Sequence, residues 1–153
     1  MAIPKTIHQI WSSCNKPLPE AFLELANTWK NFHPDWRYIF WDDQKMETFM
    51  QQYYPDYVES YNRFAYDVQR WDVIRCLILY QIGGLYVDFD TECLANVEAL
   101  FTADCCFGTD TKDNIIYAPL VKNAYLNNTY IASVPKHPFL KSVIDYVFNS
   151  DVC

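Results

Sequence analysis

The sequence contains no run of the roughly 20 apolar residues that a membrane-spanning helix needs, and Met1 is not followed by the basic and apolar pattern of a signal peptide. Basic residues are scarce, since 12 Lys and Arg stand against 19 Asp and Glu, for a formal net charge of −7. Binding to nucleic acids or anionic membranes depends on clustered positive charge, so this balance argues against both. The six cysteines form no CxxC pair and no zinc spacing with histidine, which indicates reduced thiols in a cytoplasmic protein.

The composition fits a folded chain. Of the 153 residues, 51% are hydrophobic and only 20% are charged, which excludes intrinsic disorder as the main state. The length suits one domain with a sizeable core, so we expect residues 1–153 to form a single domain. Aromatic residues reach 18%, and on composition alone we assign them to the core.

Strand and helix patterns alternate along the chain. Period-two patterns predict strands at 6–11, 37–41, 85–90, 105–109, 114–117 and 128–134. Helical patterns cover 19–33, 43–53, 57–82 and 139–148, with a helical turn at 97–101. The alternation predicts an α/β fold, and no internal repeat or obvious linker divides it.

The segment 57–82 has the strongest helical pattern. One predicted buried stripe consists of Phe64, Val68, Trp71, Ile74, Ile78 and Ile82. Asp72 and Arg75 are three residues apart on another face of this predicted helix. Gly83 and Gly84 are expected to end it, because glycine readily adopts the left-handed conformation of a helix C-terminus. Two interpretations of this charged pair are open: an ion pair that clamps the helix in place, or a site that binds sugar hydroxyls and phosphate.

The tripeptide Asp88-Phe89-Asp90 ends the predicted strand 85–90. In an extended chain, residues i and i+2 point the same way, so the two carboxylates are expected to converge. Mg²⁺ and Mn²⁺ prefer oxygen ligands and commonly bridge carboxylates to phosphates, so this pair is suited to hold a diphosphate through a metal. The alternative is a solvated acidic turn.

Four segments follow one another in a specific order: Ile3 to Trp11 (IPKTIHQIW), Trp36 to Asp43 (WRYIFWDD), Asp72-x-x-Arg75, and Ile82 to Asp90 (IGGLYVDFD). The ordered set resembles the DXD-containing glycosyltransferase family 32, related to outer-chain α-1,6-mannosyltransferases and capsular-polysaccharide sugar transferases. More distantly, it is similar to the catalytic domain of clostridial glucosylating toxins. The resemblance implies a GT-A-type, Rossmann-like core that binds a nucleotide-diphospho-sugar.

The resemblance also implies roles for individual residues. Trp11 is expected to stack on the nucleotide base, and Asp72 and Arg75 to contact the donor sugar and its phosphate side. Tyr86 is expected to lie along the nucleotide. The alternatives are a core position for Trp11 and an inward strand position for Tyr86. Trp71 stands where the family usually has the smaller serine, so the resemblance does not predict the shape of the donor pocket.

Asp88 and Asp90 are expected to serve the ribose and a divalent metal, Mn²⁺ or Mg²⁺, and with Arg75 to form the catalytic group. Transfer is expected to retain configuration, through front-face attack by the acceptor hydroxyl. Asn128 is expected near the donor pocket, although its neighbour Asn127 makes the alignment ambiguous.

The expected function is metal-dependent transfer of a hexose from a nucleotide-diphospho-sugar to a hydroxyl of a glycan or lipid-linked acceptor, in surface or capsular polysaccharide synthesis. The expected location is the cytoplasm or the inner face of the membrane, with peripheral membrane contact left open. Family members typically continue past a helix like 139–148 into an acceptor-side segment, which is expected to be missing here. The alternative is a shortened, non-catalytic module that binds a nucleotide-sugar or a glycan. His137, before Pro138, is expected to start the last helix rather than to act in catalysis.

Overall fold

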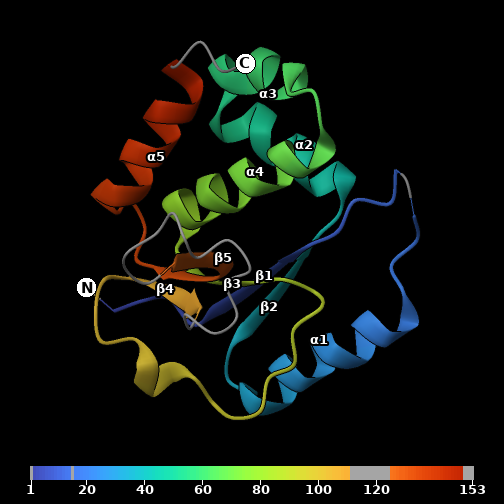
Figure 1. Ribbon diagram of the computed structural model, residues 1–153, viewed down its shortest axis with the longest axis vertical. Coiled ribbons are helices and arrows are strands. Elements are labelled where there is room, and N and C mark those ends of the chain that lie inside the picture. Colours follow the sequence, from blue (N-terminus) through green and yellow to red (C-terminus); the bar gives the residue numbers. More distant parts are fainter. Residues whose placement is uncertain (1, 15, 111–124, 150–153) are drawn as a thin grey trace.

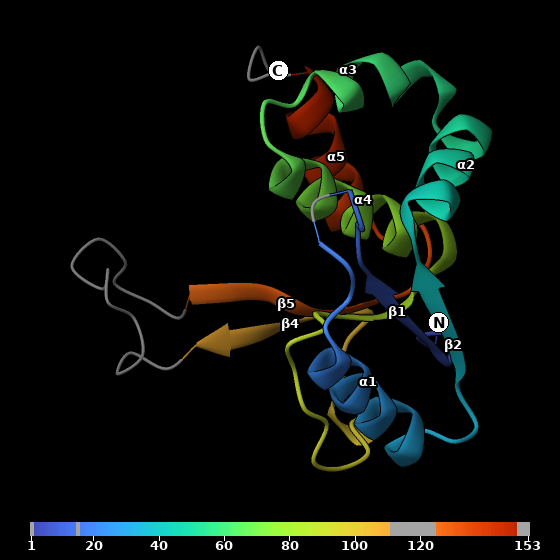
Figure 2. The ribbon, with the colours of Figure 1, turned by 90° about the vertical axis from the view of Figure 1, so that its right-hand side faces the viewer.

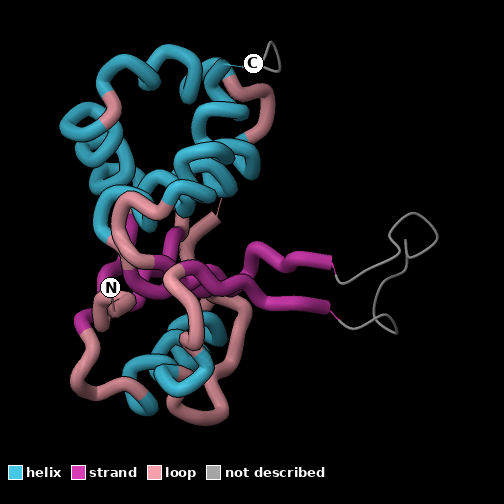
Figure 3. The backbone as a smooth tube through the Cα atoms, turned by 90° about the vertical axis from the view of Figure 1, so that its left-hand side faces the viewer, coloured by secondary structure: helices cyan, strands magenta, loops and turns pink. Residues whose placement is uncertain are grey.

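Five strands form one mixed sheet in the computed structural model, which describes residues 2–14, 16–110 and 125–149. The strand order is β2-β1-β3-β5-β4, and helices cover both faces (Figures 1 and 3). The strands are β1 (Thr6–Ile10), β2 (Arg37–Trp41), β3 (Gly84–Val87), β4 (Cys105–Asp110) and β5 (Tyr125–Ser133). This mixed α/β architecture confirms the predicted fold class.

The helices divide between the two faces of the sheet (Figure 2). One face carries α2 (Asp43–Tyr53), η1 (Pro55–Tyr57), α3 (Val58–Arg63), α4 (Asp67–Ile82) and α5 (Pro138–Asn149). The other face carries α1 (Glu20–Phe32) and η2 (Glu98–Leu100). Side chains on β3 alternate accordingly: Tyr86 packs in the cluster beneath α4, whereas Leu85 and Val87 pack with Trp29 of α1.

Strand direction determines where the functional residues meet. β1 pairs in parallel with both β2 and β3, so the carboxyl ends of the three strands lie at the same edge of the sheet. Trp11, Asp42 and Asp88 directly follow these ends. β5 runs antiparallel to β3, with Val87 opposite Tyr130, and therefore brings the start of β5 to the same edge.

The connection between α4 and β3 depends on two glycines. Gly83 and Gly84 have φ angles of 73° and 107°, which L side chains rarely adopt. A Cβ atom on Gly84 would lie 2.5 Å from the carbonyl oxygen of Thr6. The glycines thus end the helix, as expected, and also allow β3 to approach β1 closely.

The prediction of one continuous helix over 57–82 is wrong. The helix breaks at Phe64, whose ψ of 129° is extended, and α4 begins after the N-cap Tyr66, whose main-chain N–H donates to Gln69 Oε1 (3.0 Å). The apolar spacing continues across this break, so periodicity alone did not reveal it. Val68 is consequently 52% exposed, and the buried residues of α4 are Val73, Ile74, Arg75, Leu77, Ile78 and Leu79.

The other predicted elements agree with the structure to within a few residues, except strand 85–90, which ends at Val87. The predicted strand 114–117 lies outside the described residues. The five cysteines in the described part of the chain are all free thiols. Within the same part, no helix combines the length and apolar composition that a membrane crossing requires.

Candidate functional site

A cavity of about 200 Å³ lies at the carboxyl edge of β1 and β3. Its walls are Ile10, Trp11, Ser12, Phe22, Trp71, Arg75, Tyr86, Asp88, Phe89 and Asp90. Five of the six residues predicted to form the site, all but Asp72, therefore line one cavity. Asp72 joins them through its ion pair with Arg75.

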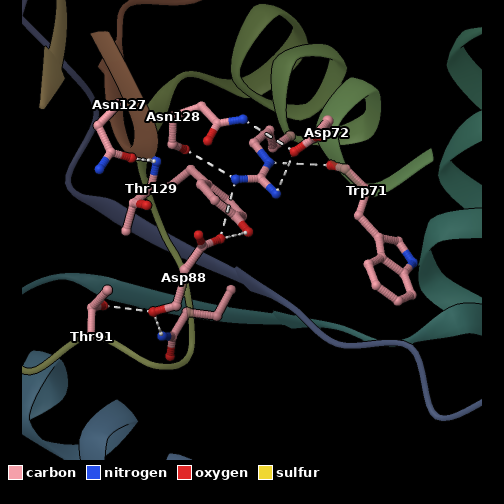
Figure 4. Close-up of polar contacts among 10 residues, drawn as sticks. Trp71, Asp72, Asp88, Thr91, Asn127, Asn128 and Thr129 are labelled. Carbon is pink, nitrogen blue, oxygen red and sulfur yellow. Dashed lines mark hydrogen bonds and ion pairs between the residues drawn. The ribbon is translucent and has the colours of Figure 1, made fainter. Parts of the chain in front are cut away.

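The main chain of Asp88 is held on both sides (Figure 4). Its N–H donates to the carbonyl of Thr129 on β5 (3.1 Å). Its carbonyl accepts from Thr91 Oγ1 (2.6 Å) and from Gln9 Nε2 (3.3 Å). Thr91 is itself fixed by Trp29 of α1, whose Nε1 donates to the Thr91 carbonyl (3.0 Å). The turn that follows β3 is thus anchored to β1, β5 and α1.

The carboxylate of Asp88 is held through one of its two oxygens. Oδ1 accepts from the Tyr86 hydroxyl (2.6 Å) and from Nη1 of Arg75 (3.2 Å). No described residue donates to Oδ2, and 28% of the side chain is exposed, so this oxygen is available to a ligand. Burial raises the pKa of Tyr86 well above its usual value, so the hydroxyl stays protonated and donates to Asp88.

Arg75 organises the cluster from a buried position, with 8% of its side chain exposed. Nε contacts the carbonyl of Trp71 (3.3 Å), and Nη1 contacts Asp88 Oδ1 and the carbonyl of Asn128 (3.0 Å). Nη2 contacts Asp72 Oδ1 (2.9 Å). Since a guanidinium has five N–H groups, these four contacts leave one for a ligand. Most N–H groups of Arg75 are therefore used within the protein, and the guanidinium cannot make a bidentate contact with a phosphate.

Asp72 and Asn128 form the outer part of the cluster (Figure 4). Asn128 Nδ2 donates to Asp72 Oδ1 (3.1 Å), the same oxygen that contacts Arg75. Asn127 has a different role, since its Oδ1 accepts from the main-chain N–H of Thr129 (2.8 Å). The geometry therefore places Asn128, not Asn127, at the site.

Asp90 lines the cavity from a turn and not from the strand in which it was expected. β3 ends at Val87, and residues 89 and 90 form a turn, so the predicted strand alternation from Asp88 to Asp90 is wrong. Phe89 is buried in this turn and packs against Trp11 and Phe40, with ring centroids at 6.1 and 5.6 Å. The exposed Asp90 nevertheless lines the same cavity as Asp88.

Trp11 forms the aromatic wall of the cavity. Its main-chain N–H donates to the carbonyl of Trp41 (3.0 Å), and its Nε1 donates to the carbonyl of Lys16 (3.1 Å). Its ring lies edge-on to that of Phe22, with centroids 5.6 Å apart. The indole is half-buried, which leaves part of it accessible from the cavity. Stacking on a nucleotide base stays a prediction.

Residues 19–107 match the family model described as a glycosyltransferase sugar-binding region containing a DXD motif. The chain belongs to this family.

Relatives agree with this assignment, and a solved structure agrees with the fold. Inositol phosphoceramide mannosyltransferase 1 of Schizosaccharomyces pombe is 32% identical over 145 residues, which are 93% of this chain and 42% of that protein. Mannosyl phosphorylinositol ceramide synthase SUR1 of Saccharomyces cerevisiae is 33% identical over 148 residues, covering 94% and 35%. The structure of PaToxG Glycosyltransferase superimposes with a TM-score of 0.70 at 20% identity, covering 96% of this chain and 61% of that chain, which supports the GT-A-like fold. The chain spans less than half the length of these yeast relatives.

The DXD pair of this family member fits a hard divalent cation. Asp88 and Asp90 line one cavity, and Asp88 keeps Oδ2 available. The described residues contain no group of three or more His, Cys, Asp or Glu side chains that could enclose a metal. Mg²⁺ and Mn²⁺ suit such an incomplete oxygen set, because they retain waters and accept substrate phosphates as further ligands.

Two further residues are placed by the structure. His137 Nδ1 accepts from the main-chain N–H of Phe139 (3.2 Å), so His137 starts α5 as expected. Trp71 and Ser12 separate the cavity from a second one of about 300 Å³ between α2, α3 and α4. The Trp71 indole points away from Asp72 and Asp88 (Figure 4).

The roles of Gln9, Thr91 and Thr129 were not predicted from the sequence. These residues hold the Asp88 main chain through contacts that depend on strands and loops distant in the chain. Gln9 lies within the segment Ile3 to Trp11, but no part of the motif indicated its contact with Asp88.

Proposed function

We propose that the protein is a metal-dependent glycosyltransferase, which moves a hexose from a nucleotide-diphospho-sugar to a hydroxyl of a glycan or lipid-linked acceptor. The observation that carries the proposal is the cavity in which Asp88 and Asp90 meet Trp11, in a chain of the DXD family. Each part of a donor has a chemical counterpart there: an aromatic ring, carboxylate oxygens and a guanidinium.

The donor sugar and the ribose need hydrogen-bond acceptors. Asp72 and Asp88 each engage Oδ1 within the protein, and neither receives a hydrogen bond at Oδ2 from another described residue. Two fixed carboxylates with one open oxygen each are suited to accept from neighbouring hydroxyl groups. Arg75 keeps both oriented and has one N–H left for the phosphate side.

Asp88 and Asp90 are the residues that would hold Mn²⁺ or Mg²⁺. The bound ion would neutralise the charge that develops on the diphosphate leaving group. The protein supplies the orientation, because Asp88 is fixed through its main chain and through Tyr86 and Arg75 before any ligand binds.

The proposal includes retention of configuration by front-face attack of the acceptor hydroxyl. The two carboxylates that line the cavity are Asp88 and Asp90, both assigned to the metal. The described walls therefore supply no further carboxylate to act as a covalent nucleophile.

The acceptor is inferred from the names of the relatives. Several are mannosyltransferases named for inositol phosphoceramide, which favours a mannose donor and a lipid-linked acceptor. A role in surface or capsular polysaccharide synthesis, and a location in the cytoplasm or at the inner face of the membrane, stay predictions from the sequence.

Donor hydrolysis by the purified chain tests the proposal. GDP-mannose and UDP-glucose are incubated with Mn²⁺, and release of the nucleoside diphosphate is followed with the unaltered chain and with Asp90→Ala. We expect release that the substitution abolishes. Binding without release supports a non-catalytic sugar-nucleotide module, and equal release by Asp90→Ala contradicts the assigned site.

A further inference from the structure

We propose that Asn128 is a positioning residue of the donor site, which fixes the orientation of Asp72 and Arg75 without contacting the reacting atoms. The inference rests on the proposed function and specifies how the sugar end of the donor is recognised. Asn128 makes two contacts with the cluster: its side-chain amide donates to Asp72 Oδ1 (3.1 Å), and its main-chain carbonyl accepts from Arg75 Nη1 (3.0 Å).

The two contacts act on groups that hold one another. Arg75 Nη2 lies 2.9 Å from the Asp72 oxygen that receives the Asn128 amide. Asp72, Arg75 and Asn128 therefore form a closed ring of polar contacts between α4 and β5 (Figure 4). A closed ring restricts Asp72 and Arg75 more than a single pair does, because each of these two side chains makes two of the three contacts.

The need for positioning is greatest at Asp72. Its side chain is 45% exposed on the surface of α4, whereas that of Arg75 is 8% exposed. An exposed carboxylate held by one ion pair gains little free energy from it and keeps rotamer freedom. The Asn128 amide adds a second donor to Oδ1, which leaves Oδ2 as the oxygen offered to a ligand.

Asn128 is itself well placed for this role. The Thr129 carbonyl accepts from the Asp88 main-chain N–H (3.1 Å). The start of β5 is thus joined to the main chain of the DXD motif one residue after Asn128. As a result, Asp72 and Asp88 are tied to the same short piece of β5, although they lie on different elements.

The chemistry of Asp72 indicates what is lost without Asn128. A carboxylate oxygen recognises hydroxyl groups, and the Asp88–Asp90 pair is the part of the site assigned to the diphosphate. Removing the Asn128 amide should therefore weaken binding of a sugar nucleotide more than binding of the corresponding nucleoside diphosphate. We expect a loss of about tenfold, the usual scale for one hydrogen bond to a charged group.

Calorimetric titration in Mn²⁺ tests the inference with GDP-mannose, UDP-glucose, GDP and UDP as probes. The variants are Asn128→Ala, Asn128→Asp, Asp72→Asn and the double variant Asn128→Ala with Asp72→Asn. Asn127→Ala is the matched control, because its side chain lies on the same strand and contacts Thr129 rather than Asp72. Circular dichroism establishes that each variant folds.

We expect Asn128→Ala to weaken binding of the sugar nucleotide about tenfold and binding of the nucleoside diphosphate less than twofold. Asn128→Asp should weaken it further, because a carboxylate then faces Asp72. The double variant should bind like Asp72→Asn alone, since a positioning residue has no effect once its target is removed. Asn127→Ala should bind like the unaltered chain.

Two results overturn the inference while leaving the proposed function in place. One is additive losses in the double variant, and the other is an equal loss from Asn127→Ala. If the unaltered, folded chain binds no sugar nucleotide, the proposed function is contradicted. The inference about Asn128 is then contradicted as well.

Discussion

The guanidinium of Arg75 lies 4.5 Å from the centre of the Tyr86 ring, and both side chains donate to the same oxygen of Asp88. The stacked arrangement fixes the direction of both donors, since each also packs against the other. Asp88 is therefore oriented by the apoprotein. A site prepared in this way loses less conformational freedom when a ligand binds.

Replacing Tyr86 by phenylalanine isolates the hydroxyl of this arrangement. The ring and its contact with Arg75 remain, so we expect the free energy of unfolding to change by no more than about 1 kcal/mol. Binding of a sugar nucleotide in Mn²⁺ should weaken several-fold, because Asp88 loses one of its two donors. Titration calorimetry and urea unfolding measure the two effects. Tyr54→Phe is the control, since its hydroxyl donates to the carbonyl of Leu77 away from the cavity.

Replacing Arg75 by lysine keeps the charge but not the geometry. An ammonium group cannot reach Trp71, Asp72, Asp88 and Asn128 together, so several of these acceptors lose their partner. We expect the free energy of unfolding to fall by about 2 kcal/mol and donor release to fall at least tenfold.

Arg70→Lys is the matched control for Arg75→Lys. Arg70 lies on the same helix, pairs with Asp67 and is more exposed. An equal loss of stability and of donor release from both substitutions would contradict the organising role of Arg75.

Trp71 should limit the size of the donor. The residue and Ser12 separate two cavities of about 200 and 300 Å³, and Trp71→Ser should join them. We expect the variant to discriminate less between GDP-mannose and UDP-glucose, measured as the ratio of their kcat/KM values. Trp71→Phe retains an aromatic partition and should preserve the ratio. Unchanged discrimination in Trp71→Ser would show that the partition is irrelevant to donor choice.

His8 should make stability depend on pH. Nε2 donates to the carbonyl of Gly83 (2.9 Å) and Nδ1 accepts from Trp41 Nε1 (3.1 Å), so both nitrogens are engaged in the neutral ring. Burial lowers the pKa of His8 from 6.5 to about 4. Between these values the unfolded chain binds a proton that the folded chain does not, so stability falls as the pH drops through this window.

The His8 contribution to that loss is up to about 3 kcal/mol at pH 4. His8→Gln cannot be protonated, so its free energy of unfolding should fall less steeply between pH 6.5 and 4.5. Urea unfolding at several pH values measures the two slopes, and His137→Gln is the control. Parallel slopes for the unaltered chain and His8→Gln would refute the assignment.

Local signals were sufficient for several parts of the fold. The strand 37–41 was predicted at the bounds observed for β2. The helix that follows Asp42 and Asp43 was predicted to end near Tyr53, where α2 ends, and Asp42 caps α2 by accepting from the Lys45 N–H (2.8 Å). The end of α4 followed from Gly83, whose positive φ few other residues adopt. The break at Phe64 was missed because it depends on main-chain geometry between two segments of equal apolar spacing.

The candidate site was predicted in part, and for a physical reason. The spacing of Asp72 and Arg75 on one helix determines their contact, and the DXD tripeptide is local. The saturation of Arg75 was not foreseeable, since Asn128 lies 53 residues further along the chain and reaches it through antiparallel pairing of β5 with β3. Such contacts follow from topology, which no short motif records.

The most direct test of the central claim is calorimetric titration of the purified chain with GDP-mannose and UDP-glucose, in Mn²⁺ and in EDTA. The proposal predicts that at least one donor binds the unaltered chain in Mn²⁺, and that binding is lost both in EDTA and in Asp90→Asn. Equal affinity in Mn²⁺ and EDTA, or in the unaltered chain and Asp90→Asn, would contradict a metal-dependent donor site at Asp88 and Asp90.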